Sequence, residues 1–158
     1  MNKLTHLNEN GEANIVNIGN KKITQRTAIA SGKVFVSLET IALIKSNAIE
    51  KGDVISVARI AGMTAAKKTP ELIPLCHNLN LEHIKIDFDI DEQNRSINVI
   101  SECQTTHKTG VEMEAMVSCS ISCLTIYDMV KSVDKSAYIN DVKLLFKSGG
   151  KSGNYQRK

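Results

Sequence analysis

The sequence contains no tryptophan, only two prolines and few aromatic residues, which make up 4% of its 158 residues. Sheets that recognise RNA commonly stack the bases on aromatic side chains of their central strands. The stretch Arg95–Cys103, which has the pattern of a strand, contains no aromatic residue. Recognition of RNA by such a sheet is therefore disfavoured.

Long apolar runs and closely paired cysteines are also missing. No run reaches the length that crosses a membrane, and the first residues do not resemble a signal peptide. The four cysteines form no CxxC pair, so they predict reduced thiols in an intracellular protein, with a metal site as the minor alternative. We predict a cytoplasmic protein with no membrane, no nucleic acid and no metal ion among its partners.

The net charge of +3 is small but unevenly distributed. Residues 142–158 contain no acid and five basic side chains: Lys143, Lys147, Lys151, Arg157 and Lys158. Such a cluster favours a small anionic partner over a nucleic-acid backbone.

The stretch Lys147–Gly153 mixes Gly, Lys and Ser, as phosphate-binding nests do. It is not a P-loop, because Leu145 stands where that motif requires Gly and no helix pattern follows. What remains is a basic, Gly-rich end to the last predicted strand.

The length suits one well-buried domain with loose ends. Residues 1–22 are polar and rich in Asn, so we predict a mobile arm in which only Asn14–Ile18 docks. Residues 23–150 are predicted to form the single domain, and residues 151–158 a flexible basic tail.

The longest helical pattern covers residues 109–131, and the rest of the fold is predicted to pack around it. Thr109 and Glu112 have the spacing of a capping box, which predicts that the helix starts at Thr109. Its apolar residues cover more than one stripe, as expected of a helix packed on a sheet and on another element. Four charged residues interrupt this surface: Glu112, Glu114, Asp128 and Lys131. In one interpretation Glu112 and Glu114 interact with the positive end of the helix dipole, and Asp128 and Lys131 form an ion pair on the surface. In the other the four are functional groups, and this stretch alone leaves both interpretations open.

Hydrophobic periodicity and turn residues predict the remaining elements. In order they are a strand (Thr24–Val36), a helix capped by Ser37 (Leu38–Lys45), a helix capped by Asp53 and ending near Lys67, a hairpin (His83–Asp91 and Ser96–Cys103), the long helix, and a strand (Ile139–Lys147) with Val142, Leu144 and Phe146 facing the core. This order predicts an α+β fold, a ferredoxin-like two-layer sandwich with an antiparallel sheet and helices on one face.

The loop Leu72–Leu79 carries Pro74 shortly before Cys76 and His77, so the backbone around the histidine is constrained. A single histidine in an apolar setting is more often a hydrogen-bonded structural residue than a catalyst. The loop by itself therefore leaves the role of His77 open.

Six stretches carry a resemblance to a known family: Lys51-Gly-Asp-Val, Ala58-Arg-Ile-Ala-Gly, Leu72-Ile-Pro-Leu-Cys-His, Lys108-Thr-Gly-Val-Glu-Met-Glu-Ala, Leu124-Thr-Ile-Tyr-Asp-Met-Val-Lys and Lys147-Ser-Gly-Gly-Lys-Ser-Gly. From about residue 12 to residue 153 the chain resembles the molybdenum cofactor biosynthesis protein C family, the cyclic pyranopterin monophosphate synthases. The resemblance implies a lyase that converts a cyclised guanosine triphosphate, 3',8-cyclo-7,8-dihydro-GTP, into cyclic pyranopterin monophosphate and releases pyrophosphate. It also implies the ferredoxin-like fold and a hexamer built as a trimer of dimers, with active sites at the dimer interface.

The resemblance also implies roles for individual residues. Asp128 would be the catalytic acid or base, and Lys51 and Lys131 would be the essential lysines. The segments that would contact the substrate are Leu75, Cys76 and His77 together with Glu112 and Met113. Asn78 departs from the family's Cys-His-Pro pattern, which affects the shape of the loop after the histidine.

The residue types agree with this chemistry. Rebuilding a pterin ring and closing a cyclic phosphate need groups that give and take protons, which carboxylate, imidazole and lysine side chains provide. The departing pyrophosphate needs cations, for which Arg26, Lys67 and Lys147 are candidates, with solvent-exposed charge as the alternative. Because no metal-ligand spacing is visible, we expect no cofactor, and we expect lysines to supply most of the positive charge. Mg²⁺ bound to the triphosphate is compatible with the sequence.

The competing hypothesis is a non-catalytic ferredoxin-like module that binds a phosphorylated ligand. Such a module has no use for Glu112, Glu114 and Asp128 beside its lysines, so these acids favour the enzyme, with Glu114 as a further substrate-binding candidate. Glu112 and Asp128 are sixteen positions apart in one helix, which separates them by roughly 24 Å. A site that uses both is predicted to join two chains.

Overall fold

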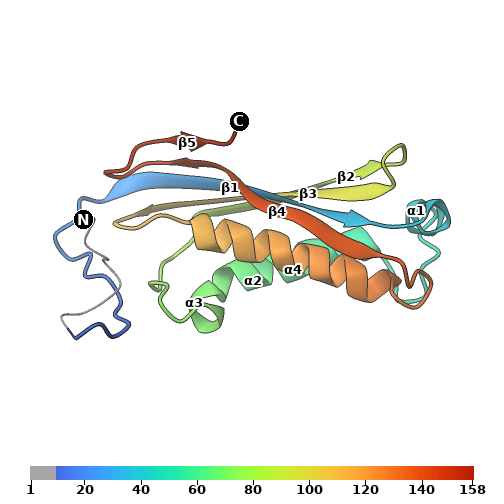
Figure 1. Ribbon diagram of the computed structural model, residues 1–158, viewed down its shortest axis with the longest axis horizontal. Helices are drawn as coiled ribbons and strands as arrows, with labels where there is room; N and C mark the ends of the chain where they lie inside the picture. Colours follow the sequence, from blue (N-terminus) through green and yellow to red (C-terminus); the bar gives the residue numbers. More distant parts are fainter. Residues whose placement is uncertain (1–9) are drawn as a thin grey trace.

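The computed structural model describes residues 10–158 and shows an antiparallel sheet with the long helices beneath one face (Figure 1). Residues 1–9, the first part of the predicted arm, lie outside the described residues. The strands are β1 (Thr24–Phe35), β2 (His83–Asp91), β3 (Ser96–His107), β4 (Tyr138–Ser148) and β5 (Tyr155–Gln156), in the spatial order β2-β3-β1-β4-β5. The helices are α1 (Leu38–Lys45), α2 (Val54–Lys67), α3 (Thr69–Leu72) and α4 (Glu112–Val130). The predicted α+β ferredoxin-like sandwich is confirmed.

Local capping fixes two helix starts as predicted. Ser37 Oγ accepts a hydrogen bond from the backbone N–H of Thr40 at 3.1 Å, at the start of α1. Asp53 Oδ1 accepts one from the N–H of Ser56 at 3.0 Å, before α2. Pro70 lies in the first turn of α3, where an N–H would have no helical partner.

Helix α4 lies at the centre of the fold, packed on β1, β3 and β4 and also on α2. Small residues bring these layers together. Gly62 of α2 leaves no room for a Cβ beside Ser122, and Gly32 of β1 lies against the thiols of Cys119 and Cys123. By length and composition α4 could also cross a membrane, contrary to the sequence prediction, although core helices of soluble proteins pass the same test. Its packing on two sides accounts for its apolar composition.

The predicted capping box at the start of α4 is wrong. The helix begins at Glu112, Val111 is its N-cap residue, and no side chain caps it. The Glu112 carboxylate lies beside Lys147 of β4, with 2.9 Å between Oε1 and Nζ. An ion pair with a distant element therefore replaces the expected contact with Thr109.

Strand β4 carries a bulge at Leu145. Phe146 pairs with Ile29 of β1, and Leu144 pairs with Ala30, so one residue of β4 is extra. Because successive side chains of a strand point to opposite faces, one extra residue turns the side chains that follow it to the other face.

The bulge corrects the prediction for the end of this strand. Phe146 lies on the helix-free face and not in the core. Leu144 packs against the core and Val142 lies close to Gly32, both as predicted. After the bulge, Lys147 turns to the helix side of the sheet, where it reaches the start of α4.

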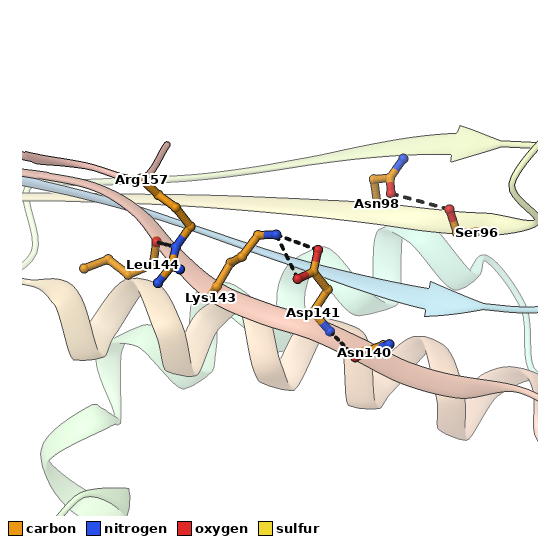
Figure 2. Close-up of polar contacts among 7 residues, drawn as sticks. All are labelled: Ser96, Asn98, Asn140, Asp141, Lys143, Leu144 and Arg157. Carbon is orange, nitrogen blue, oxygen red and sulfur yellow. Dashed lines mark hydrogen bonds and ion pairs between the residues drawn. The ribbon is translucent and has the colours of Figure 1, made fainter.

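The end of the chain differs from the predicted flexible tail. Tyr155 of β5 pairs with Lys147 of β4, so this part of the tail forms a short edge strand. Figure 2 shows Arg157 reaching back to β4, where its Nε donates a hydrogen bond to the carbonyl of Leu144 at 2.8 Å. The chain reverses before β5 through glycines with positive φ, among them Gly149 and Gly150.

Candidate active site

A pocket of about 880 Å³ is lined by the start of β1, the end of β4 and the loop before α4. Six cationic side chains and one carboxylate line it: Lys21, Lys22, Arg26, Lys108, Lys147, Lys151 and Glu112. We call it the cationic pocket. A concave surface with this excess of positive charge suits a small polyanion.

Arg26 is the most buried of these cations, with 9% of its surface exposed. Its guanidinium donates hydrogen bonds to the carbonyls of His107 and Lys108, both at 3.4 Å. Gly149 and Gly150 pass so close to this side chain that a Cβ on either would crowd it. The Gly-rich stretch after β4 thus permits close approach to the guanidinium, a role different from that of a P-loop.

Lys147 and Glu112 form an ion pair in the lining of the cationic pocket. Their side chains are 29% and 32% exposed, so this pair is less screened by water than one on the open surface. A bound anion would compete with Glu112 for the Lys147 ammonium group.

A second pocket of about 630 Å³ adjoins the first. It shares four residues with the cationic pocket: Lys21, Thr109, Gly110 and Glu112. Its lining includes all six substrate-contact candidates from two distant segments: Leu75, Cys76, His77, Glu112, Met113 and Glu114. We call it the His77 pocket. The fold therefore places these candidates around one cavity.

Glu114 is an almost fully buried carboxyl group, with 3% of the residue exposed. Burial raises the pKa of Glu114 to about 7, and the negative charge of Glu112 adds to this effect. Burial, followed by the charge of Glu114, also raises the pKa of the Cys76 thiol. Glu114 can hold or release a proton near neutral pH, whereas Cys76 is a poor nucleophile.

We expect Glu114→Gln to stabilise the protein at high pH and to have little effect at low pH. The ordinary pKa of this group is 4.5, and its folded pKa is about 7. In the parent, the stability that depends on a protonated Glu114 is therefore fully present below pH 4.5 and is lost as the pH rises through about 7. The loss is on the order of 3 kcal/mol. Urea unfolding of parent and variant at about pH 4 and about pH 9 measures this difference. A stability gap that is the same at both pH values would contradict the assignment.

The other end of α4 carries Asp128, which is bound by two lysines. Lys51 Nζ donates to the backbone carbonyl of Asp128 at 2.8 Å and to its Oδ2 at 2.9 Å, and Lys131 Nζ lies 2.7 Å from Oδ1. Lys131 and then Lys51 lower the pKa of Asp128 to about 2, while Asp128 raises the pKa of Lys131. At neutral pH Asp128 is therefore a carboxylate and Lys131 is protonated, and in the free protein these shifts make Asp128 a weaker base and Lys131 a weaker acid.

Asp134 holds the segments that carry this group. Its Oδ2 accepts a hydrogen bond from the N–H of Ser37, at the start of α1, at 2.7 Å. Its own N–H donates to the carbonyl of Val130, the last residue of α4, at 2.9 Å. The end of α4 is thereby tied to α1, the helix that precedes the turn with Lys51.

The model of the MoaC family matches residues 15–150 of this sequence, which is most of the chain. The chain belongs to the MoaC family. It is 48% identical over 156 residues to a protein of Chloroflexus aurantiacus named cyclic pyranopterin monophosphate synthase, covering 99% of this chain and 96% of the relative. Proteins with the same name from Clostridium perfringens (51% identical, 98% of each chain) and Pelotomaculum thermopropionicum (48% identical, all of this chain and 93% of the relative) are similarly related. A synthase is an enzyme, so MoaC relatives of this chain are enzymes.

In this MoaC family member the predicted site residues other than Lys67 fall into two groups. One surrounds the two pockets at the start of α4, and the other, with Lys51, Asp128 and Lys131, lies at the end of α4. Lys67 is exposed at the end of α2 and lines neither pocket. Within residues 10–158 no group of three or more His, Cys, Asp and Glu could hold a metal ion.

Sequence reasoning missed three cations that line the cationic pocket, namely Lys21, Lys22 and Lys108, and it placed Lys151 in a basic, Gly-rich stretch without naming it as a site residue. Lys108 opens one of the stretches that resemble the MoaC family, and Lys151 lies in another, so their motifs carried a signal. Lys21 and Lys22 belong to the predicted arm, where no local pattern indicated contact with the domain.

Proposed function

We propose that this chain is a cyclic pyranopterin monophosphate synthase of molybdenum cofactor biosynthesis, a phosphorus–oxygen lyase. Its substrate would be 3',8-cyclo-7,8-dihydro-GTP, and its products cyclic pyranopterin monophosphate and pyrophosphate. The observation that carries the proposal is the cationic pocket, whose six cations suit a triphosphate. The names and high identity of the MoaC relatives, over nearly the whole chain, agree with it.

The cationic pocket would hold the part of the substrate that leaves. Closing the cyclic phosphate forms a bond from a ribose oxygen to the innermost phosphorus and breaks the bond to pyrophosphate. Arg26 and Lys147 would stabilise the negative charge that develops on this leaving group. Lys67 would contact the substrate only from outside the two pockets.

Asp128, Lys51 and Lys131 would supply the acid–base steps. The Asp128 carboxylate would take the proton of an attacking or rearranging group, and protonated Lys131 would donate one. Both steps require the substrate to displace the ion pair that holds the pKa of Asp128 low and that of Lys131 high. The non-catalytic alternative would use the cationic pocket but would not need this second group.

One active site would combine both groups from two chains. Within one chain, the rise of the helix places Glu112 and Asp128 roughly 24 Å apart, which exceeds the reach of one nucleotide. A two-fold dimer would bring the start of one α4 beside the end of its partner, and three such dimers would form a hexamer. Exposed apolar side chains on α2 and α4, namely Val57, Ile60 and Leu124, offer surface for such contacts.

The remaining expectations follow from this function. We propose a cytoplasmic enzyme that acts on a small molecule and that needs neither a membrane nor a nucleic acid. Mg²⁺ would enter, if at all, with the triphosphate of the substrate.

Pyrophosphate release from the cyclised nucleotide tests this function, and Lys147→Ala should weaken substrate binding in the same assay. Because Lys147 would bind a phosphate group, the variant should have a higher KM than the parent. The difference in KM should become smaller as salt is added, because salt screens the contact between Lys147 and the phosphate in the parent. The matched control is Lys85→Ala, which removes a lysine from an exposed ion pair on β2. No pyrophosphate from the parent would contradict the function, and an unchanged KM in the variant would contradict the role of Lys147.

A further inference from the structure

Residues 16–22 cross from the His77 pocket to the cationic pocket, and we call them the strap. Two side chains of the domain bind it through main-chain carbonyls. His77 Nε2 lies 2.7 Å from the carbonyl oxygen of Val16, and Lys108 Nζ donates to the carbonyl of Gly19 at 2.6 Å. Figure 1 shows the segment that leads into β1 at the end of the molecule where α4 begins.

The strap lines both cavities. Val16 and Ile18 line the His77 pocket, Lys22 lines the cationic pocket, and Lys21 lines both. Val16 and Ile18 are partly buried, whereas Asn17 between them is exposed, so alternate side chains of the segment pack against the domain. The strap is thus built into the pocket walls and not merely adjacent to them.

The contact with Val16 decides which nitrogen of His77 carries a proton. A carbonyl oxygen only accepts hydrogen bonds, so Nε2 must be the donor. In the neutral ring, Nδ1 is then left as the proton acceptor. The strap therefore fixes both the orientation and the tautomer of a histidine that lines the pocket.

We propose that the strap is a positioning segment of the active site, which holds His77 by its Nε2–H so that Nδ1 alone exchanges protons or hydrogen bonds with the bound substrate. This proposal rests on the proposed function for its substrate. The orientation of the ring is a property of the free protein and can be measured without turnover.

The test compares Ile18→Asp with Ile15→Asp in the full chain. Ile18 lines the His77 pocket, and a carboxylate there should lift the strap, whereas Ile15 lies outside the strap with 47% of its surface exposed. A third variant that starts at Gly19 removes Val16 itself, and a variant lacking residues 2–9 is its control. The core does not depend on these residues, since residues 10–19 are exposed or only partly buried.

The first readout is the Nε2–H proton of His77 in ¹⁵N-edited NMR spectra, assigned by its loss in His77→Asn. A ring N–H bound to a carbonyl exchanges slowly and is visible, so the signal should appear in the parent and both controls and vanish in the two strap variants. The second readout is kcat, which should fall in both strap variants by about ten- to a hundredfold, as when a ligating histidine loses its outer-shell partner.

The outcomes separate the strap from the function. A parent without this N–H signal, or strap variants that lose the signal but keep the parent's kcat, would overturn the proposal. A higher kcat in the strap variants would show that the strap blocks the site and would overturn it as well. If the parent releases no pyrophosphate, the proposed function fails, and the N–H signal still reports on the strap.

Discussion

Asp128→Ala is expected to lower kcat by about a hundred- to ten-thousandfold, the usual cost of removing a positioned acid–base group. The carboxylate sits between Lys51 and Lys131, and no other carboxylate contacts these two ammonium groups in the described residues. Without it, the two lysines would face each other with no base between them. Pyrophosphate release from the cyclised nucleotide measures the loss.

The variant should remain folded, because Asp128 lies on the surface and its side chain is 53% exposed. Exposed ion pairs contribute little to stability. Asp87→Ala is the matched control, since the ion pair of Asp87 with Lys85 has the same 2.7 Å separation and a similar exposure of 54%. Both variants should unfold at about the parent's urea concentration. A kcat of Asp128→Ala within a few-fold of the parent would end the catalytic assignment.

Features set by neighbouring residues could be predicted from the sequence. Ser37 and Asp53 cap their helices through amides three residues further along, so the sequence spacing contains the whole interaction. The same holds for the alternation in β2, where Ile86 is buried between exposed neighbours.

Features set by distant residues could not be predicted in this way. The bulge at Leu145 appears only in the pairing of β4 with β1, and it decides that Lys147 and not Phe146 faces the helices. The ion pair of Lys147 with Glu112 follows from that bulge and removes the expected capping box. No local pattern in β4 or at the start of α4 contains this information.

In the candidate site, too, contacts between residues close in the sequence could be predicted, and contacts between distant residues could not. Helix spacing predicted that Asp128 and Lys131 lie together, because Lys131 directly follows α4 and comes three positions after Asp128. The cations of the strap reach the pocket through contacts between main-chain carbonyls and the side chains of His77 and Lys108. Because any residue can offer a main-chain carbonyl, such contacts depend on the path of the chain and cannot be predicted from the residue types of the strap.

Chains with Glu112→Ala and chains with Asp128→Ala, each inactive alone, are expected to regain activity when they are produced together. Glu112 belongs to the pocket group and Asp128 to the group at the far end of α4, so one chain cannot present both to one nucleotide. A mixed dimer would contain one site with both defects and one site with neither. With random pairing, about a quarter of all sites would be intact.

This mixed-dimer assay tests the central claim most directly, because it asks whether two chains build one site for pyrophosphate release. The two variants carry different affinity tags, so that sequential purification isolates assemblies that contain both chains. Because three dimers would form each hexamer, random pairing leaves about a quarter of the sites in these assemblies intact, and the account predicts pyrophosphate release at about a quarter of the parent's rate per chain. Mixed assemblies as inactive as either variant alone, with pairing of the two chains within a dimer shown by cross-linking, would contradict it.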